Sequence, residues 1–341
     1  MPIDPIATDV ENEVPVSRSP YGASAAWIEQ VRTGLPPLII TCCLNGGVQG
    51  KESHPGLPET PAELARSAKE AYDAGASAVH VHPRNPEDWS ESSGDPDFNY
   101  EVNALIREAC PDLIINNTTG GSASTTMEQR FAMVDANCEM ASLNLGPDMS
   151  RFRVPERSAP LEHPHPAAEY DLCIPFTYGT IEGLAAQMHR RGIRPEMELY
   201  NPGQFWVSNE LIRKALIEPP YVFQFVMGYQ TASFATPEAL VALARDLPDG
   251  AVYFVAGVGV HQLPMTTMAT IMGGHVRVGL EDNLYYSRGV KLTGNGQAVE
   301  RAVRIAREVN REVASPAQAR ETLGLSSVPS TYEARGSAVA P

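Results

Sequence analysis

Short apolar runs alternate with longer amphipathic stretches through most of the chain. The short runs are rich in β-branched residues, and the longer stretches carry apolar residues at helical spacing, which is typical of a parallel sheet with crossover helices. The pattern contains about eight such units, and for one of them it leaves two strand positions open. The predicted strands are residues 38–44, 78–82, 113–117, 140–144, either 174–178 or 197–200, 222–227, 252–256 and 275–279.

Helix starts are marked by a hydroxyl residue followed by proline. Thr60-Pro61, Thr236-Pro237 and Ser315-Pro316 each combine an N-cap with proline in the first turn. A doubly wound sheet would fit the same alternation, but polar residues follow nearly every predicted strand, and a barrel collects those strand ends into one mouth. We therefore predict an α/β protein with a (β/α)8 TIM barrel over residues 36–325 and helices near its C-terminal end. Residues 1–35 are predicted to form an N-terminal extension and residues 326–341 a C-terminal tail, because both are rich in Pro, Ser and acidic residues without a sustained period.

Composition narrows the class of protein. The 341 residues are 43% hydrophobic and 20% charged, and no apolar run approaches the roughly 20 residues of a membrane helix. The acidic N-terminal segment does not resemble a secretory signal, so a cytoplasmic location is expected. The five cysteines lack CxxC spacing and are predicted to be reduced, mostly in the core. A net charge of −15 without a basic cluster argues against a nucleic-acid partner.

The sequence His80-Val81-His82 ends one predicted strand. Residues two apart on a strand share a face, so both imidazoles are expected to point the same way. Two neutral imidazoles are half of a zinc site, and a catalytic zinc needs a third protein ligand and an open position. Glu281 follows another predicted strand and is the candidate third ligand. Taken alone, the two histidines fit a chance pair in a polar core equally well.

Arg277 and Asp282 flank the end of the last predicted strand. A guanidinium near Asp282 is expected to keep its carboxylate ionised and to fix its direction, as a general base requires. An ordinary ion pair that ties a strand end to its helix explains the same spacing.

Small polar groups follow three other strands. The candidates for contact with a substrate are Thr118, Thr119, Gly120, Ser142, Asn144 and Glu198. For each of them a turn or a helix cap is the alternative explanation. Asn45-Gly46-Gly47 is similar, since the glycines either admit a ligand or turn the chain. Patterns of the GxGxxG, Walker, GxSxG and CxxC type are absent from the sequence.

Seven sequence strings together resemble the β-keto acid cleavage enzyme family, whose founding activity is 3-keto-5-aminohexanoate cleavage. The resemblance covers about residues 37–325 and is specific, because the strings fall at predicted strand ends in the family's order. They are ITCCLNGG, AGASAVHVHPR, PDLIINNTTGG, EMASLNLG, FQFVMG, VAGVGVHQLPM and GGHVRVGLEDN.

The resemblance implies a zinc-dependent TIM barrel, usually oligomeric, for which a homotetramer is a reasonable expectation. Its expected partners are a β-keto acid and acetyl-CoA, which the family converts into acetoacetate and a new acyl-CoA. The resemblance assigns the zinc ion to His80, His82 and Glu281, and the acid–base chemistry to Asp282 with Arg277. Thr118 stands where a serine is common in the family, and Ser142 where a threonine is, so both exchanges keep a hydroxyl.

The chain departs from the family mostly at positions expected to touch substrate. Val48 stands where relatives with amino-bearing substrates carry a glutamate, which implies a substrate without a cationic amine at that end, although Glu198 matches a family acid. Val260 stands where an arginine is frequent, so an anion contact for CoA is absent or supplied elsewhere. Residues 155–170 look longer than the family pattern and are expected to cover the pocket or to serve an oligomer contact. Their second histidine pair, in His163-Pro164-His165, is predicted to be a solvated turn rather than a metal site.

Rival functions remain open on the sequence alone. A zinc-dependent aldolase or hydrolase on a TIM barrel would share the metal ligands, although the hydrolase would need further His or Asp ligands that the later strand ends do not offer. A non-catalytic sensor would use the barrel only for binding. Dependence on acetyl-CoA separates the predicted reaction from all three.

Overall fold

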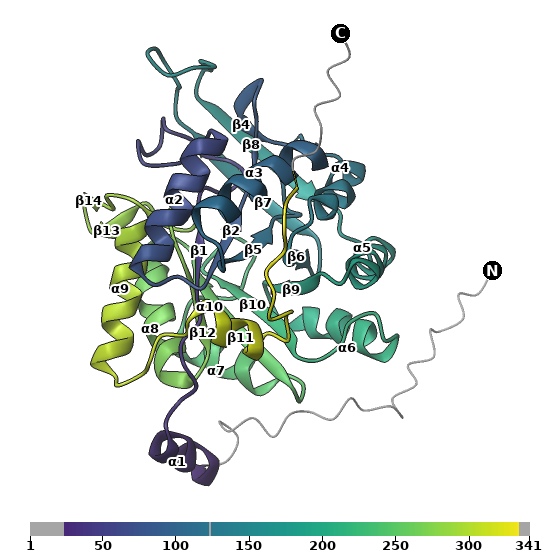
Figure 1. The fold of residues 1–341 in the computed structure, drawn as a ribbon, viewed down its shortest axis with the longest axis vertical. Helices are drawn as coiled ribbons and strands as arrows, with labels where there is room; N and C mark the ends of the chain where they lie inside the picture. Colours follow the sequence, from purple (N-terminus) through teal and green to yellow (C-terminus); the bar gives the residue numbers. More distant parts are fainter. Residues whose placement is uncertain (1–23, 123, 334–341) are drawn as a thin grey trace, which may run out of the picture.

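Eight parallel strands close into a barrel in the computed structural model, which describes residues 24–122 and 124–333 (Figure 1). The first strand pairs with both the second and the last, so the sheet has no open edge. This confirms the predicted TIM barrel and rules out the doubly wound sheet. In order around the barrel the strands are β1 (Ile40–Cys43), β12 (His275–Val278), β11 (Ala251–Gly257), β10 (Tyr221–Met227), β9 (Arg194–Leu199), β6 (Met140–Asn144), β5 (Ile114–Asn117) and β2 (Ala78–Val81).

The predicted strands agree with the observed ones to within two or three residues at each end. Of the two positions left open, the strand near residues 197–200 belongs to the barrel, as β9. Residues 174–178 instead link a hairpin strand to a helix, because Ile174 ends β8 (Ala168–Ile174) and Tyr178 begins α5 (Tyr178–Arg191). An apolar run of five residues cannot distinguish these cases by itself.

Helices cover the outside of the barrel, and three of them begin at the residues predicted from the sequence. The side chains of Thr60, Thr236 and Ser315 each accept a hydrogen bond from a first-turn backbone amide, as N-caps do. The longer helices are α2 (Pro61–Ala74), α3 (Pro96–Ala109), α5 (Tyr178–Arg191), α6 (Phe205–Arg213), α7 (Pro237–Arg245), α8 (Gln262–Met272) and α9 (Asn295–Glu308), and the shorter ones are α4 (Met127–Ala132) and α10 (Pro316–Thr322).

The Thr60 cap gives a direct test of how local signals stabilise the barrel. The Glu63 amide donates to Thr60 Oγ1 at 3.3 Å, and the Thr60 amide donates to Glu63 Oε2 at 3.2 Å, which is a complete capping box. Replacing Thr60 with Ala is expected to lower the free energy of unfolding by about 1 kcal/mol, as measured by urea titration. Thr60→Ser is the control, and an equal loss in that variant would contradict the capping role.

Side chains inside the barrel change from apolar to polar along the strands. At the N-terminal ends, Ile39, Ile114, Met140 and Phe254 form a compact cluster that α10 covers with Ala319 and Leu323. Two residues further along the strands the inward side chains include His80, Asn116, Ser142, Glu196 and Gln224, all buried. The alternation of strand side chains thus places a closed apolar floor beneath a polar layer. Chemistry is therefore confined to the C-terminal end of the barrel.

Three small two-stranded sheets lie outside the barrel. The longest is the hairpin of β7 (Asp148–Val154) and β8, which is drawn in teal and projects beyond the barrel in Figure 1. The other two are β3 (Arg84–Asn85) with β4 (Asp88–Ser92), and β13 (Tyr285–Ser287) with β14 (Val290–Lys291).

The described residues of the N-terminal extension and of the C-terminal tail differ in how they lie relative to the barrel. Within the predicted extension the chain forms a helix that the sequence pattern did not indicate, α1 (Ser24–Thr33), which lies apart from the barrel in Figure 1. The described part of the predicted tail packs on the barrel, where Tyr332 stacks edge-on against Tyr100 and the Ser330 amide donates to the buried Glu139. The remainder of both segments, residues 1–23 and 334–341, lies outside the described residues.

All five cysteines are free, and four of them are buried. Cys42, Cys43, Cys110 and Cys138 agree with the predicted core positions, whereas Cys173 is exposed on β8. Among the helices of the described chain, none combines the length and the apolar content needed to cross a membrane.

Candidate active site

A cavity of about 440 Å³ lies at the C-terminal ends of the barrel strands. Most of the residues singled out in the sequence reach its wall, although they come from strands far apart in the chain. These are Val48, His80, His82, Thr118, Gly120, Glu198, Arg277, Glu281 and Asp282. Closure of the barrel brings them together, because it carries the ends of β2, β5, β9 and β12 to one rim.

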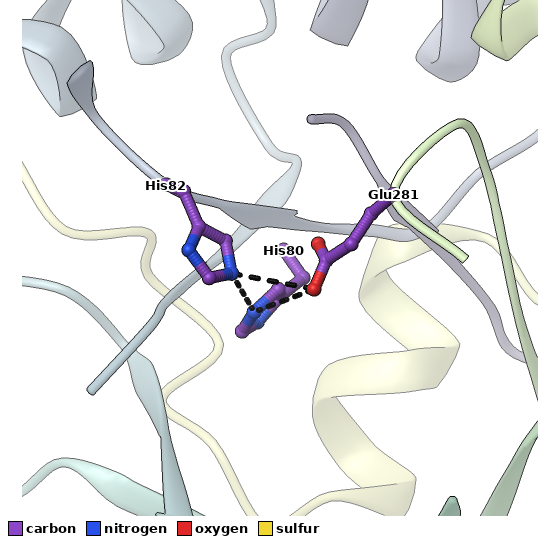
Figure 2. A group of neighbouring side chains, drawn as sticks. All are labelled: His80, His82 and Glu281. Carbon is purple, nitrogen blue, oxygen red and sulfur yellow. Dashed lines mark hydrogen bonds and ion pairs between the residues drawn. The ribbon is translucent and has the colours of Figure 1, made fainter. Parts of the chain in front are cut away.

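His80, His82 and Glu281 lie side by side in this cavity, with both imidazole rings turned toward the carboxylate (Figure 2). The two Nε2 atoms are 3.2 Å apart, and Glu281 Oε1 lies 3.3 Å from His82 Nε2 and 3.9 Å from His80 Nε2. Ligand atoms around a tetrahedral zinc ion are about 3.3–3.5 Å apart, because the bonds to nitrogen and oxygen are about 2.0–2.2 Å long. Two of the three separations are close to this spacing and the third, between His80 Nε2 and Glu281 Oε1, is longer at 3.9 Å, so the donors fit a zinc ion with a small shift of one side chain.

The protonation of these groups also suits metal binding. Burial lowers the pKa of His80 to about 3, so the ring is neutral at physiological pH. Burial alone would raise the pKa of the Glu281 carboxyl, but the Arg277 guanidinium and the two imidazoles outweigh it and hold that pKa well below its usual value. Glu281 Oε2 is buried and has no hydrogen-bond partner in the described chain. A buried carboxylate oxygen without a partner is costly, and a cation at this point would remove that cost.

Gly46 and Gly47 allow the loop after β1 to approach these donors closely. A Cβ on Gly46 would lie 2.7 Å from Glu281 Cγ, and Gly46 has a φ of +66°, which disfavours other residues. A Cβ on Gly47 would lie 2.1 Å from the carbonyl oxygen of Gly121 and 3.2 Å from His82 Nδ1. The positive φ of Gly46 fits the explanation that this glycine turns the chain, and both glycines let the loop pack against Glu281, Gly121 and His82. The explanation that they admit a ligand stays a prediction.

Arg277 connects three carboxylates at the floor of the cavity. Its Nε and Nη2 atoms donate to the two oxygens of Asp282 at 3.0 and 3.1 Å, Nη2 also donates to Glu281 Oε1 at 2.6 Å, and Nη1 donates to Glu198 Oε1 at 3.2 Å. Asp282 Oδ2 further accepts a hydrogen bond from Cys43 Sγ at 3.0 Å. The predicted pairing of Arg277 with Asp282 is thus present, in the bidentate form that fixes a carboxylate most firmly.

The charge state of Asp282 reflects two opposing effects. Burial raises the pKa of its carboxyl above the usual value, while the Arg277 guanidinium acts to lower it. The expectation that the arginine alone would set the charge of Asp282 was therefore incomplete, because it left out desolvation. A carboxylate with a raised pKa is a stronger proton acceptor than one in water.

Glu198 is also perturbed. Burial raises the pKa of its carboxyl to about 8, and the nearby Glu196 carboxylate adds to this although Arg277 opposes it. Glu198 is therefore mostly protonated at neutral pH, when it can donate a hydrogen bond. Its neighbour Glu196 lies deeper and accepts a hydrogen bond from Asn116 Nδ2 at 2.7 Å.

The small polar candidates divide into two groups. Thr118 and Gly120 line the cavity, and Thr118 Oγ1 accepts a hydrogen bond from the Gly120 amide at 2.8 Å. Thr119, Ser142 and Asn144 are not among the cavity-lining residues. Thr119 Oγ1 donates to the Ser142 carbonyl at 2.8 Å, and Asn144 Oδ1 accepts from the Tyr200 hydroxyl at 3.0 Å, so these three hold the strand ends in position.

The cavity wall includes side chains that the sequence did not single out. Tyr200 and Tyr229 follow β9 and β10, and a whole face of the β7–β8 hairpin adds Phe152, Tyr170 and Leu172. The period-2 alternation in DMSRFRV and AEYDLCI indicates two half-buried strands and could have identified this face.

The second histidine pair lies in the connection between β7 and β8. His163 has a φ of +52°, and its ring packs edge-on against Trp89. Within the described ranges, only His80, His82 and Glu281 form a group of three donors close enough to share a metal ion. His163 lies in a bend, as predicted, whereas His165 forms an antiparallel β-bridge with Arg157 rather than part of a turn.

Comparisons with known proteins agree on one family. A sequence model of the beta-keto acid cleavage enzyme family matches residues 37–325. The 3-keto-5-aminohexanoate cleavage enzyme of Acetoanaerobium sticklandii is 39% identical over 289 residues, covering 85% of this chain and 98% of the relative. The 3-oxoadipate:acetyl-CoA acetyltransferase of Cupriavidus necator is 31% identical, covering 86% and 96%. The solved apo structure of ObcA is similar in fold, with a TM-score of 0.62 and 18% identity over 80% of this chain and 66% of that one.

Proposed function

This chain belongs to the beta-keto acid cleavage enzyme family, and on that premise we propose that it uses zinc to convert a β-keto acid and acetyl-CoA into acetoacetate and a new acyl-CoA. Relatives named as acetyltransferases and transferases act on keto acids with acetyl-CoA, so the chain is an enzyme of acyl transfer. The observation that carries the proposal is the cluster of His80, His82 and Glu281 beside the Arg277–Asp282 pair in one cavity.

Zinc is the cofactor that this donor set fits best. Two imidazoles, of which that of His80 is neutral, and one ionised carboxylate supply three ligands, which leaves one position of a tetrahedral ion open, as in other catalytic zinc sites. When bound there, zinc would act as a Lewis acid that polarises the keto group of the substrate.

Asp282 is the group that we assign to proton removal. Deprotonation of a β-keto acid occurs at the carbon between the keto group and the carboxylate, and it needs a base fixed within reach of that carbon. Arg277 holds Asp282 through two hydrogen bonds, and the raised pKa of the Asp282 carboxyl strengthens it as a base. The Thr118 hydroxyl and the Gly120 region, across the cavity, would orient the substrate carboxylate.

The bonds in the proposed reaction balance without a further reactant. The carbon that has lost its proton attacks the thioester carbonyl of acetyl-CoA, which forms a carbon–carbon bond and expels the CoA thiolate. That thiolate then attacks the keto carbon of the original substrate. The bond between this carbon and the former nucleophile breaks, which leaves an acyl-CoA and, after the carbon regains a proton, acetoacetate.

One side chain in the loop after β1 limits which substrates the cavity can bind. Val48 lines the cavity and carries no charge, so a cationic amine would find no partner there. We therefore propose a substrate without an amine at that end. A homo-oligomer, as in the expectation from the resemblance, remains part of the proposal and can be measured by light scattering.

The proposal is tested by metal content and by product formation on the same purified protein. Incubation with acetyl-CoA and a panel of β-keto acids is expected to give acetoacetate and a CoA ester in equal amounts, with one zinc per chain by mass spectrometry. The control omits acetyl-CoA and should give neither product. Bound zinc with cleavage that does not depend on acetyl-CoA would contradict the proposal and favour an aldolase or a hydrolase.

A further inference from the structure

The β7–β8 hairpin has two chemically different faces. Cross-strand pairing places Phe152 opposite Tyr170 and Ser150 opposite Leu172 on one face, and all four line the cavity. The other face carries ion pairs of Arg151 with Asp171 at 2.6 Å and of Arg153 with Glu169 at 2.7 Å, whose side chains are largely exposed. The hairpin is therefore amphipathic, and the face turned toward the cavity is uncharged except for Asp148 at its base.

The strand ends of the barrel add further apolar side chains to the cavity lining. These are Val48, Val226, Val258 and Leu284, which come from four different strand ends. Together with Phe152, Val154, Leu172 and Ile174 of the hairpin, these residues enclose the cavity above the metal-binding group.

A buried ion-pair network fixes the far end of the hairpin. Arg157, in the connection between the hairpin strands, donates to Glu59 Oε1 and Oε2 at 2.7 and 3.0 Å and to Glu52 Oε2 at 2.8 Å. The side chains of all three residues are only 2% exposed. Glu52 and Glu59 belong to the connection between β1 and α2 that also carries Val48, so the network joins the hairpin to this second segment of the cavity lining. A bidentate, buried arginine of this kind fixes the geometry of both segments.

Three charged side chains line the cavity besides Glu198, Arg277, Glu281 and Asp282: Arg153, Asp148 and Glu91. Arg153 is paired with Glu169, and its side chain is 83% exposed. Asp148 lies at the base of the hairpin, and burial raises the pKa of its carboxyl. Glu91, at the rim, accepts hydrogen bonds from the hydroxyls of Ser122 and Ser124. Asp148 is paired across the hairpin with Ile174, so the uncharged part of the wall is the part around Phe152, Val154 and Leu172. A charged substrate group placed there would lose its hydration without gaining a partner.

We propose that the β7–β8 hairpin is the specificity wall of the enzyme and selects β-keto acids whose variable side chain is uncharged and apolar. The inference rests on the proposed function, since it concerns the substrate of that same site. The apolar wall binds the keto acid side chain rather than the pantetheine arm of CoA. CoA is longer than the cavity, so its pantetheine arm must extend toward solvent. The side chain of the keto acid is short enough to lie entirely against the hairpin.

The first experiment compares substrates of similar length on the zinc-loaded, full-length enzyme. The panel is 3-oxohexanoate, a 3-oxodicarboxylate and a 3-oxo acid with a terminal amine, and the readout is acetoacetate formed with acetyl-CoA. The value of kcat/KM is expected to be at least about tenfold higher for the alkyl substrate than for either charged one. A preference for the amine would overturn the inference and point to Asp148 and Glu198, while acetoacetate from any of the substrates would still support the proposed function.

The second experiment alters the wall itself. Leu172→Ala is expected to lower kcat/KM for 3-oxohexanoate about tenfold and to leave the KM for acetyl-CoA unchanged. Cys173→Ala is the matched control, because the adjacent residue points to the exposed face, and it should change neither value. An increase confined to the KM for acetyl-CoA would assign the wall to pantetheine and overturn the inference. Zinc content and circular dichroism verify folding, and the substrate comparison on the unaltered enzyme decides the question if Leu172→Ala does not fold.

Discussion

Replacing His80 with alanine is expected to remove bound zinc and to lower the rate of acetoacetate formation by roughly 10³-fold or more. The two remaining donors, His82 and Glu281, cannot hold the ion in a three-ligand site. Loss of a Lewis acid that stabilises developing charge costs several kcal/mol in the transition state, and each 1.4 kcal/mol corresponds to about a tenfold change in rate. Glu281→Ala is expected to behave in the same way. Metal content by mass spectrometry and turnover are measured on the same preparation.

Matched controls show whether the loss of zinc and turnover is specific to His80 and Glu281 or follows the removal of any histidine or glutamate. His189 lies exposed in the last turn of α5 and Glu101 lies exposed on α3, and neither residue lines the cavity. His189→Ala and Glu101→Ala should keep both zinc and turnover. If His80→Ala also kept a full complement of zinc, the ion would have to bind elsewhere, and the proposed site would be wrong.

Local sequence patterns were sufficient to predict the barrel. Each strand of a parallel barrel is buried on both sides, so it appears in the sequence as a short apolar run bounded by turn residues. The ambiguity at β9 has a physical cause, because the inward residues of this strand include Glu196 and Glu198, which interrupt the apolar run. The helix α1 could not be predicted, because it lies in a segment without a clear period.

The candidate site could be predicted in part for a similar reason. Strand periodicity places His80 and His82 on one face, and closure of the barrel brings the end of β12, with Glu281, to the same rim. The number of partners that Arg277 has could not be predicted. Its contact with Glu198 joins residues 79 positions apart, and whether their side chains meet depends on closure of the barrel and on the stagger of its strands rather than on any local pattern.

The arrangement of the β7–β8 hairpin could be predicted from the sequence only in part. A longer segment between residues 155 and 170 was evident, and covering the pocket was one of two roles considered for it. Of these residues only Tyr170 lines the cavity, and the other cavity-lining residues of the hairpin lie outside the segment. The segment is held by Arg157, whose carboxylate partner Glu59 lies 98 residues earlier in the chain. An arginine in a loop is usually a solvated charge, and only the tertiary structure distinguishes it from a buried anchor.

Asp282 and Glu281 are adjacent in the chain but have different surroundings. Glu281 faces the two histidines, whereas Asp282 is held by Arg277 Nε and Nη2 and by Cys43 Sγ. One carboxylate is thus suited to bind the metal and the other to accept a proton, so their roles should separate in a pair of variants.

Asp282→Asn is expected to keep zinc and to lower kcat by about 10²–10⁴-fold, which is the usual contribution of a positioned general base. Asparagine preserves the size of the side chain and leaves His80, His82 and Glu281 intact, but its amide cannot accept the substrate proton. Turnover is measured at saturating acetyl-CoA together with metal content, and Asp249→Asn, at an exposed position before β11, is the control. The KM for the keto acid should change little. If the variant retained most of its kcat, another group would have to take the proton. Loss of zinc together with activity would instead show that Asp282 acts by holding the metal-binding group in place through Arg277.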